Sequence, residues 1–150
     1  MVRLYGITNV TSSGSSSGIN QGVVLRGITH NNGTTYLTTT STGNENSSNM
    51  LIIPENNTVI MEISIVARTD TNPIYGAGWL LDGMAKRGSN ANSVSLMGIS
   101  MSSCMSDSQL SGLQIFITEN VSTGGISIQC KGINQYTVVN WIATIVLTEA

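Results

Sequence analysis

Only 9% of the 150 residues are Asp, Glu, Lys or Arg, compared with roughly a quarter in an ordinary soluble domain. Ser, Thr and Asn make up about a third of the chain, so most of its polarity is uncharged. With one His, two Cys and a net charge of −2, the composition argues against an enzyme, a metal or cofactor site, and binding to nucleic acid or an anionic membrane.

The N-terminal part, residues 1–32, is predicted to be an extended arm and linker with a possible strand. It opens with MVRLYGITNV, continues through a Ser/Gly run between Ser12 and Gly18 that has linker composition, and resumes with VVLRGITH. The opening lacks the charged and continuously apolar regions of a signal peptide. We therefore expect the chain to be made and kept in a cytoplasm until assembly or lysis.

The middle of the chain reads as strands. Asn32-Gly33 is a two-residue turn signal and predicts a first hairpin between VVLRGIT and TTYLTTT. NMLIIP is a short apolar strand that ends at Pro54. The stretch TVIMEISIVART alternates, and because Ile60 and Val66 interrupt the polar side, it is predicted to be a central strand whose outer side is partly covered. Its predicted core face comprises Val59, Met61, Ile63, Ile65 and Ala67.

Beyond a turn at residues 70–73, five further strands are expected, each closed by Gly, Ser or Asn. They are GWLLDGMAKRG, SVSLMGIS, LQIFITEN, GISIQCKG and TVVNWIATIVL. Inward sets are Leu113, Ile115 and Ile117 in the third of these, and Ile126, Ile128 and Cys130 in the fourth. Short strands with regular turn signals and no helical period predict an all-β fold, an antiparallel β-sandwich or barrel.

The residues that could carry chemistry are few and scattered. His30, the single imidazole, precedes the Asn-Gly turn and is interpreted as a solvated turn residue rather than a catalytic base. The carboxylates are not clustered, and no zinc, calcium or dinucleotide motif is present. Cys104 and Cys130 permit a disulfide, but the spacing does not argue for one, and we interpret both as buried thiols.

Aromatic side chains are the remaining candidates for ligand contact. Trp141 alternates with Val139 and Ala143 and is predicted to lie in the core, as is Trp79. Tyr75 and Tyr136 fall in expected loops or strand starts, where a carbohydrate or partner contact is an alternative to packing.

From about Thr38 onward, the order of segments resembles a β-domain family of tailed-bacteriophage virion proteins, of head-decoration and tail-fibre types. The segments are YLTTTST, NMLIIPENN, ISIVARTD, GWLLDGMAKRG and NWIATIVLTEA. The resemblance implies a single antiparallel, jelly-roll-like β-sandwich over residues 33–150 that works as part of an oligomer. It also marks structurally important positions: Arg68, Trp79, Lys86, Arg87 and Trp141.

The resemblance implies a bacteriophage virion structural protein, and the absence of heptads or shaft repeats favours a capsid decoration (cement) protein over a fibre. Expected partners are the major capsid protein and further copies of the chain, with a homotrimer favoured by analogy. The segments VRLYGIT and VVLRGIT, with Arg3, Tyr5 and Arg26, are predicted to add strands to neighbouring subunits. Deletion of residues 1–20 would test this.

The alternative is a tail-fibre or receptor- or carbohydrate-binding module of the virion. Tyr75 and Tyr136 would then contact a host-surface glycan.

Overall fold

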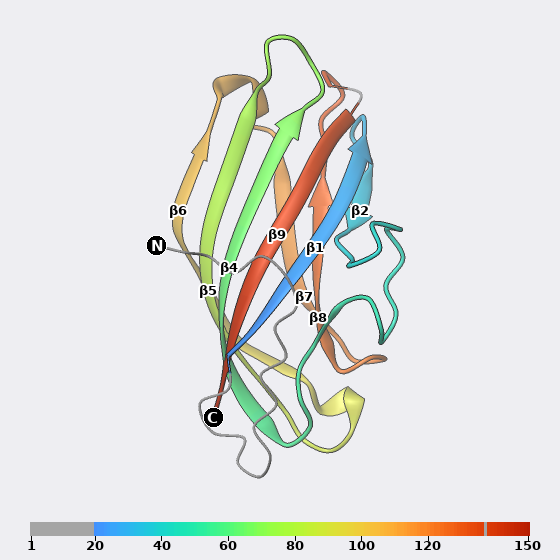
Figure 1. Cartoon of the computed structure of the whole chain (residues 1–150), viewed down its shortest axis with the longest axis vertical. Coiled ribbons are helices and arrows are strands. Elements are labelled where there is room, and N and C mark those ends of the chain that lie inside the picture. The colour runs from blue at the N-terminus through green and yellow to red at the C-terminus, as the bar shows by residue number, and fades with distance from the viewer. Residues whose placement is uncertain (1–19, 137) are drawn as a thin grey trace.

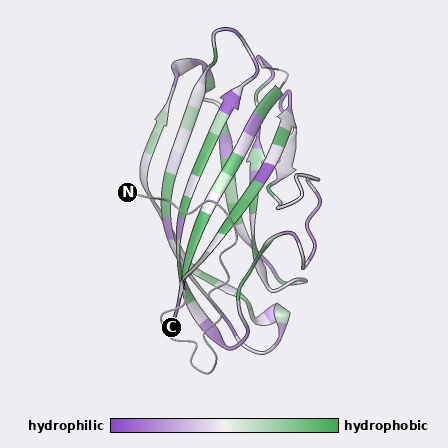
Figure 2. Cartoon of the chain, in the orientation of Figure 1, coloured by the Kyte–Doolittle hydropathy of each residue, from purple (hydrophilic) through white to green (hydrophobic). Residues whose placement is uncertain are grey.

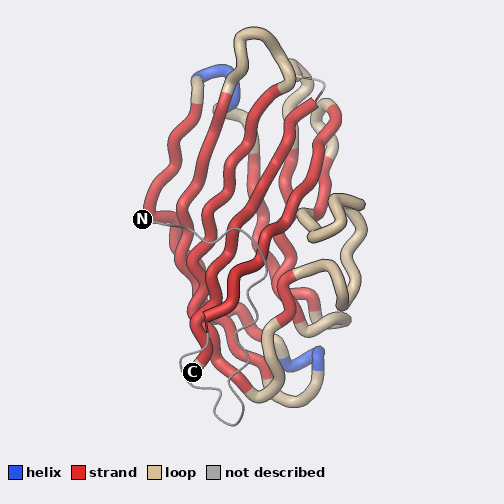
Figure 3. The backbone as a smooth tube through the Cα atoms, in the orientation of Figure 1, coloured by secondary structure: helices blue, strands red, loops and turns tan. Residues whose placement is uncertain are grey.

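The structure is a computed structural model that describes residues 20–136 and 138–150. Within these residues the protein is all-β, and its strands form two packed antiparallel sheets with two short 3₁₀ turns, as the sequence predicted (Figure 3). The strands are β1 Asn20–His30, β2 Thr34–Tyr36, β3 Leu51–Ile52, β4 Asn57–Thr69, β5 Gly76–Arg87, β6 Ser95–Ser106, β7 Gln114–Asn120, β8 Gly125–Lys131 and β9 Val138–Glu149.

The first sheet, sheet A, has the order β1-β9-β4-β5-β6 (Figure 1). The last strand, β9, lies between β1 and β4, so the two ends of the described chain are joined in one layer. β4, β5 and β6 follow one another as a meander within this sheet. A jelly roll instead sends successive strands to alternate sheets, so the meander is the part of the topology that departs from that pattern.

The second sheet, sheet B, is built around β8. β7 pairs with the whole of β8 on one side, and β2 and β3 share its other side. β2 lies opposite residues 129–131 and β3 opposite residues 125–126, so together they form one interrupted row. Between them the chain makes a long excursion, residues 38–50, whose neck is closed where Thr39 N–H donates to the Asn49 carbonyl at 2.9 Å.

The predicted first hairpin is wrong, although its turn is present. Asn31 has φ 51°, and Gly33 N–H donates to the His30 carbonyl at 3.0 Å. β1, however, pairs along its full length with β9, and β2 pairs with β8, so the turn carries the chain from one sheet to the other. A single bridge between Arg26 and Thr38 links the two segments. A turn signal defines the reversal but not the layer that the next strand joins.

β1 also moves the domain boundary that was expected at residue 32. The possible strand within residues 1–32 is an integral strand of sheet A, so the sandwich includes the described residues from Asn20 onward. The segment VVLRGIT, which was expected to add a strand to a neighbouring subunit, pairs with β9 of its own chain. Residues 1–19, which carry the rest of the expected arm, lie outside the described part of the chain.

The core lies between the two sheets and follows the predicted alternation. In β4 the five residues expected to face inward are all buried, and β9 buries Val139, Trp141, Ala143, Ile145 and Leu147 in the same way. Figure 2 shows hydrophobic positions along the strands of sheet A. β4 is a central strand as predicted, and Ile60 and Val66 on its outer side are about half exposed, at 51% and 53%.

Candidate functional site

Tyr75 and Tyr136, the predicted ligand-contact aromatics, lie together but do not form a surface platform. Their ring centroids are 5.7 Å apart with planes inclined by 50°, and Tyr136 is buried while Tyr75 is half-buried. Burial and the adjacent Tyr75 raise the pKa of the Tyr136 phenol. Of the two alternatives for Tyr136, the structure therefore shows packing, because its ring lies against the core instead of projecting from a loop.

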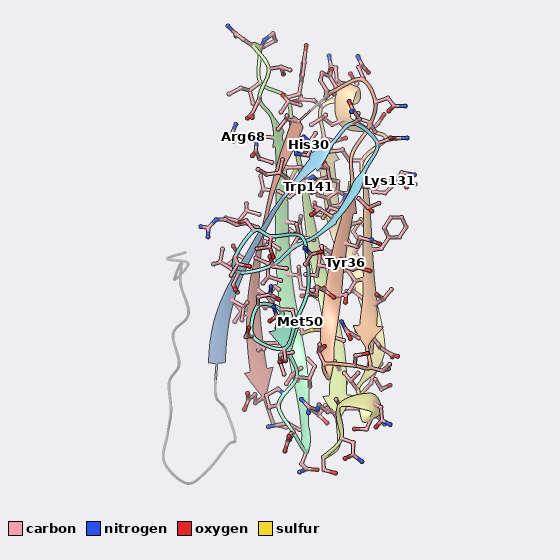
Figure 4. All side chains as sticks on the ribbon, turned by 90° about the vertical axis from the view of Figure 1, so that its right-hand side faces the viewer. His30, Tyr36, Met50, Arg68, Lys131 and Trp141 are labelled. Atoms are coloured by element: carbon pink, nitrogen blue, oxygen red, sulfur yellow. The ribbon has the colours of Figure 1, made fainter. Side chains whose placement is uncertain are left out.

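Trp79 and Trp141 are both buried, as predicted, and stack on each other with centroids 5.6 Å apart. Trp141 Nε1 donates a hydrogen bond of 2.9 Å to the buried Thr29 hydroxyl. Figure 4 shows Trp141 toward the end of the sandwich that also carries His30 and Arg68. His30 is exposed beside its turn, as predicted, and Arg68 pairs with Asp70 at 2.9 Å on the surface.

Arg26 is the one predicted binding residue that the structure places on an open surface. Its backbone is held to Thr38 by two hydrogen bonds of 2.8 and 3.0 Å, and its side chain is exposed on the outer face of sheet A. There it borders a depression of about 340 Å³. The depression is lined by Arg26, Ile28, Val66, Arg68, Asn140 and Ile142, among other residues. Arg3 and Tyr5 lie outside the described residues.

The outer face of sheet A continues beyond this depression as a broad mixed surface. Across it, exposed apolar side chains come from β1, β4, β5 and β9: Ile28, Ile60, Val66, Leu80, Met84 and Val146. Near its middle, Glu62 and Asp82 lie directly opposite each other on adjacent strands. Like charges at such positions destabilise a sheet, so a cationic group from a partner would be favourable there.

Two other polar clusters hold the ends and loops of the sandwich together. Arg87 donates to the Ile53 carbonyl at 3.0 Å, lies 3.6 Å from Glu55, and packs over Gly124 in the β7–β8 turn. In the excursion loop, Glu45 Oε2 accepts hydrogen bonds from Ser127 at 2.6 Å and Asn120 at 3.1 Å. Each of these contacts joins segments distant in sequence, which indicates a structural role for both side chains.

The two cysteines are unpaired, and only one matches its predicted burial. Cys130 is fully buried in β8, and burial raises the pKa of its thiol. Cys104 is exposed on β6, so the expectation of two buried thiols is wrong for it. Sequence alternation could not show this, because the exposure of Cys104 depends on how far sheet B extends beneath β6.

Sequence reasoning also did not predict the exposed surface that β6 forms on sheet A. The strand SVSLMGIS was expected, but β6 extends to Ser106 and is exposed along most of its length. The sequence feature that could have drawn attention to this strand is the absence of any Asp, Glu, Lys or Arg between Arg87 and Asp107.

In the described part of the chain, no group of three or more His, Cys, Asp or Glu side chains is arranged to hold a metal ion. Among the same residues, no helix is long and apolar enough to cross a membrane. Comparison with protein-family models, with curated proteins and with solved structures finds no match to this chain.

Proposed function

We propose that the chain is a structural protein of a bacteriophage virion, made in the host cytoplasm, that decorates the head and stabilises it by binding the major capsid protein. The virion context is supported by the resemblance of residues 38–150 to that family. The observation that carries a binding role is the outer face of sheet A, where six large apolar side chains are exposed among the charged side chains of Arg26, Glu62, Arg68, Asp82 and Lys86.

This face has the character of a protein-contact surface. Apolar side chains exposed together on one face mark interaction sites more often than scattered ones do. Contacts made by its apolar and uncharged polar groups are weakly screened, so this part of the attachment should persist as salt concentration rises, whereas a contact through its charged side chains should weaken. The opposed Glu62 and Asp82 would accept a cationic group of the capsid subunit.

The N-terminal segment supplies a second contact in this proposal. Arg3 and Tyr5 would add a strand to a neighbouring sheet through backbone hydrogen bonds. Because Asn20 already belongs to β1, the deletion that tests this contact should end at residue 19. We expect the deleted chain to fold and to lose occupancy on heads. Unchanged occupancy would remove the arm from the proposal.

The location is tested by labelling phage particles with gold-conjugated antibodies raised against the purified protein. Label on heads supports decoration, label on tails supports the tail module, and particles without label contradict both. A homotrimer on threefold positions is the arrangement favoured by analogy with other decoration modules, and particle symmetry at the labelled sites checks it.

The contact face is tested with Ile60→Lys, which places a charge among the apolar side chains of the outer face. We expect reduced head occupancy with retained folding. Val121→Lys is the matched control, because Val121 is exposed to a similar degree, at 52% against 51%, but lies in the β7–β8 turn. Equal occupancy of the two variants would count against this face.

A receptor- or carbohydrate-binding module remains the second candidate, now centred on the depression beside Arg26. An exposed guanidinium beside Asn140 and apolar side chains suits hydroxyl and carboxylate groups of a glycan. Binding on a glycan array that Arg26→Gln abolishes would favour it, and an array without any bound glycan would exclude it for the glycans tested.

A further inference from the structure

β6 forms one edge of sheet A, and its side chains are exposed on both faces. It has β5 as its strand neighbour and, within the described residues, no strand beyond it (Figure 1). Sheet B is narrower than sheet A, so it does not cover the inward side of β6. Four large apolar side chains are exposed on this one strand: Met97, Ile99, Met101 and Met105.

The outward backbone of β6 is also open over most of its length. At its start, Leu96 N–H donates to Glu119 Oε1 at 2.6 Å, which closes that end. From Met97 to Ser106, no backbone hydrogen bond to a described element other than β5 is present. Edge strands with free N–H and C=O groups pair with further strands unless charge, proline or distortion prevents it, and the register irregularities of β6 at Met97 and Ser102 restrict such pairing to the segment between them.

The charge pattern selects the strand that would pair there. Residues 88–106 contain no Asp, Glu, Lys, Arg or Pro. In a twofold contact each strand faces its own copy, so any charge near the axis would meet the same charge. A strand without charge is therefore compatible with itself, while it offers nothing to attract an oppositely charged partner.

The geometry points to a twofold homodimer in which β6 pairs antiparallel with β6 of a second copy, joining two copies of sheet A into one continuous sheet. This inference does not depend on head decoration, but it replaces the homotrimer that analogy favours, since a trimer in solution would overturn it. Register irregularities at Met97 and Ser102 leave Gly98–Met101 as the regular segment. In an antiparallel pair, directly opposed residues project to the same face of the sheet, so the twofold axis must lie between the two copies of a single residue. We place the axis at Ser100, which is central in β6.

With the axis at Ser100, the side chain of Ile99 lies opposite Met101 of the second copy, and the reverse holds on the other side of the axis. Both residues project to the inward face of sheet A, since their partners on β5 are Gly83 and Leu81. The pairing therefore covers apolar surface that the single chain leaves exposed, in addition to satisfying backbone groups.

The first test is the mass of the full chain in solution, measured by light scattering during gel filtration. We expect twice the 15.8 kDa of one chain. Met101→Lys should give the monomer mass and weaken dimerisation by about tenfold or more, because two lysines would lie near the axis. Val121→Lys, at matched exposure of 52% against 53%, should remain dimeric. A monomeric or trimeric wild-type chain, or a dimeric Met101→Lys variant, would overturn the inference.

The second test uses disulfide cross-linking and does not depend on the folding of Met101→Lys. In a Cys104→Ser background, Ser100→Cys should form an intermolecular disulfide on oxidation, because opposed residues have Cα atoms about 4.5–5.5 Å apart. Ser106→Cys, at the end of the same strand, should not. Cross-linking at residue 106, or none at residue 100, contradicts the pairing.

The two proposals fail separately. A monomer that still decorates heads would remove the β6 dimer and leave the head-decoration proposal standing. A dimer with no label on any particle would do the reverse.

Discussion

Trp79 of β5 and Trp141 of β9 stack in the core with their ring planes inclined by only 20°. The two strands are not neighbours, since β4 separates them in sheet A, so the pair spans the centre of the sheet. The hydrogen bond from Trp141 Nε1 to Thr29 extends this contact to β1. This aromatic pair and its hydrogen bond thus connect β5, β9 and β1 on the inner face of sheet A.

Replacing Trp141 by Phe should destabilise the fold by about 1–3 kcal/mol, because the buried Thr29 hydroxyl loses its partner. Urea unfolding measures the change. Thr29→Val removes the acceptor of the same hydrogen bond. The double variant should therefore lose less than the sum of the single losses, and strict additivity would show that the bond contributes nothing.

Replacing Gly124 by Ala should cost about 1–3 kcal/mol, because Gly124 has φ +77° in the β7–β8 turn. An added Cβ would also lie 2.6 Å from Cζ of Arg87, whose guanidinium is held by the Ile53 carbonyl. Thermal unfolding in the wild-type and Arg87→Ala backgrounds separates the two effects. The loss should be smaller in the Arg87→Ala background, and an equal loss would mean that the guanidinium moves aside freely.

Replacing Glu45 by Ala should loosen the excursion loop, residues 38–50, and cost about 1–3 kcal/mol, because the Ser127 hydroxyl and Asn120 amide lose their acceptor. Limited proteolysis should cut this loop faster than in the wild-type chain. Glu55→Ala is the control, since that carboxylate is largely exposed and makes only a 3.6 Å ion pair. Equal cleavage of the two variants would contradict the anchoring role of Glu45.

The two thiols should differ in reactivity. An aromatic disulfide reagent should modify the exposed Cys104 in the folded protein and reach Cys130 only after unfolding. Modification of two thiols per folded chain would contradict the burial of Cys130.

The burial of Cys130 also predicts a pH dependence of stability. Its pKa is raised in the folded state, while the unfolded chain ionises near the ordinary value of 9.0. The stabilising contribution is therefore complete below about pH 9 and declines at higher pH, by at most about 1.4 kcal/mol per pH unit. The slope of unfolding free energy against pH should be shallower in Cys130→Ala, and identical slopes would refute this origin.

Much of the fold was accessible from residue patterns. The alternation in β4 and the inward sets of β7, β8 and β9 predicted which side chains form the core, because a strand with one buried face needs an apolar residue at every second position. The candidate site was less accessible. Tyr75 and Tyr136 were each named as candidates for ligand contact or for packing, but their expected loop positions did not reveal that the two rings lie together and that Tyr136 is covered.

By itself, the sequence determined that this protein is all-β, where most of its strands lie and which residues of β4, β7, β8 and β9 face inward, since these depend on residues close together in the chain. Only the tertiary structure decided that β1 pairs with β9 instead of β2, and that β6 is left at an uncovered edge. The physical reason is that strand neighbours and the relative widths of two sheets depend on contacts between residues distant in the chain, which no local pattern specifies.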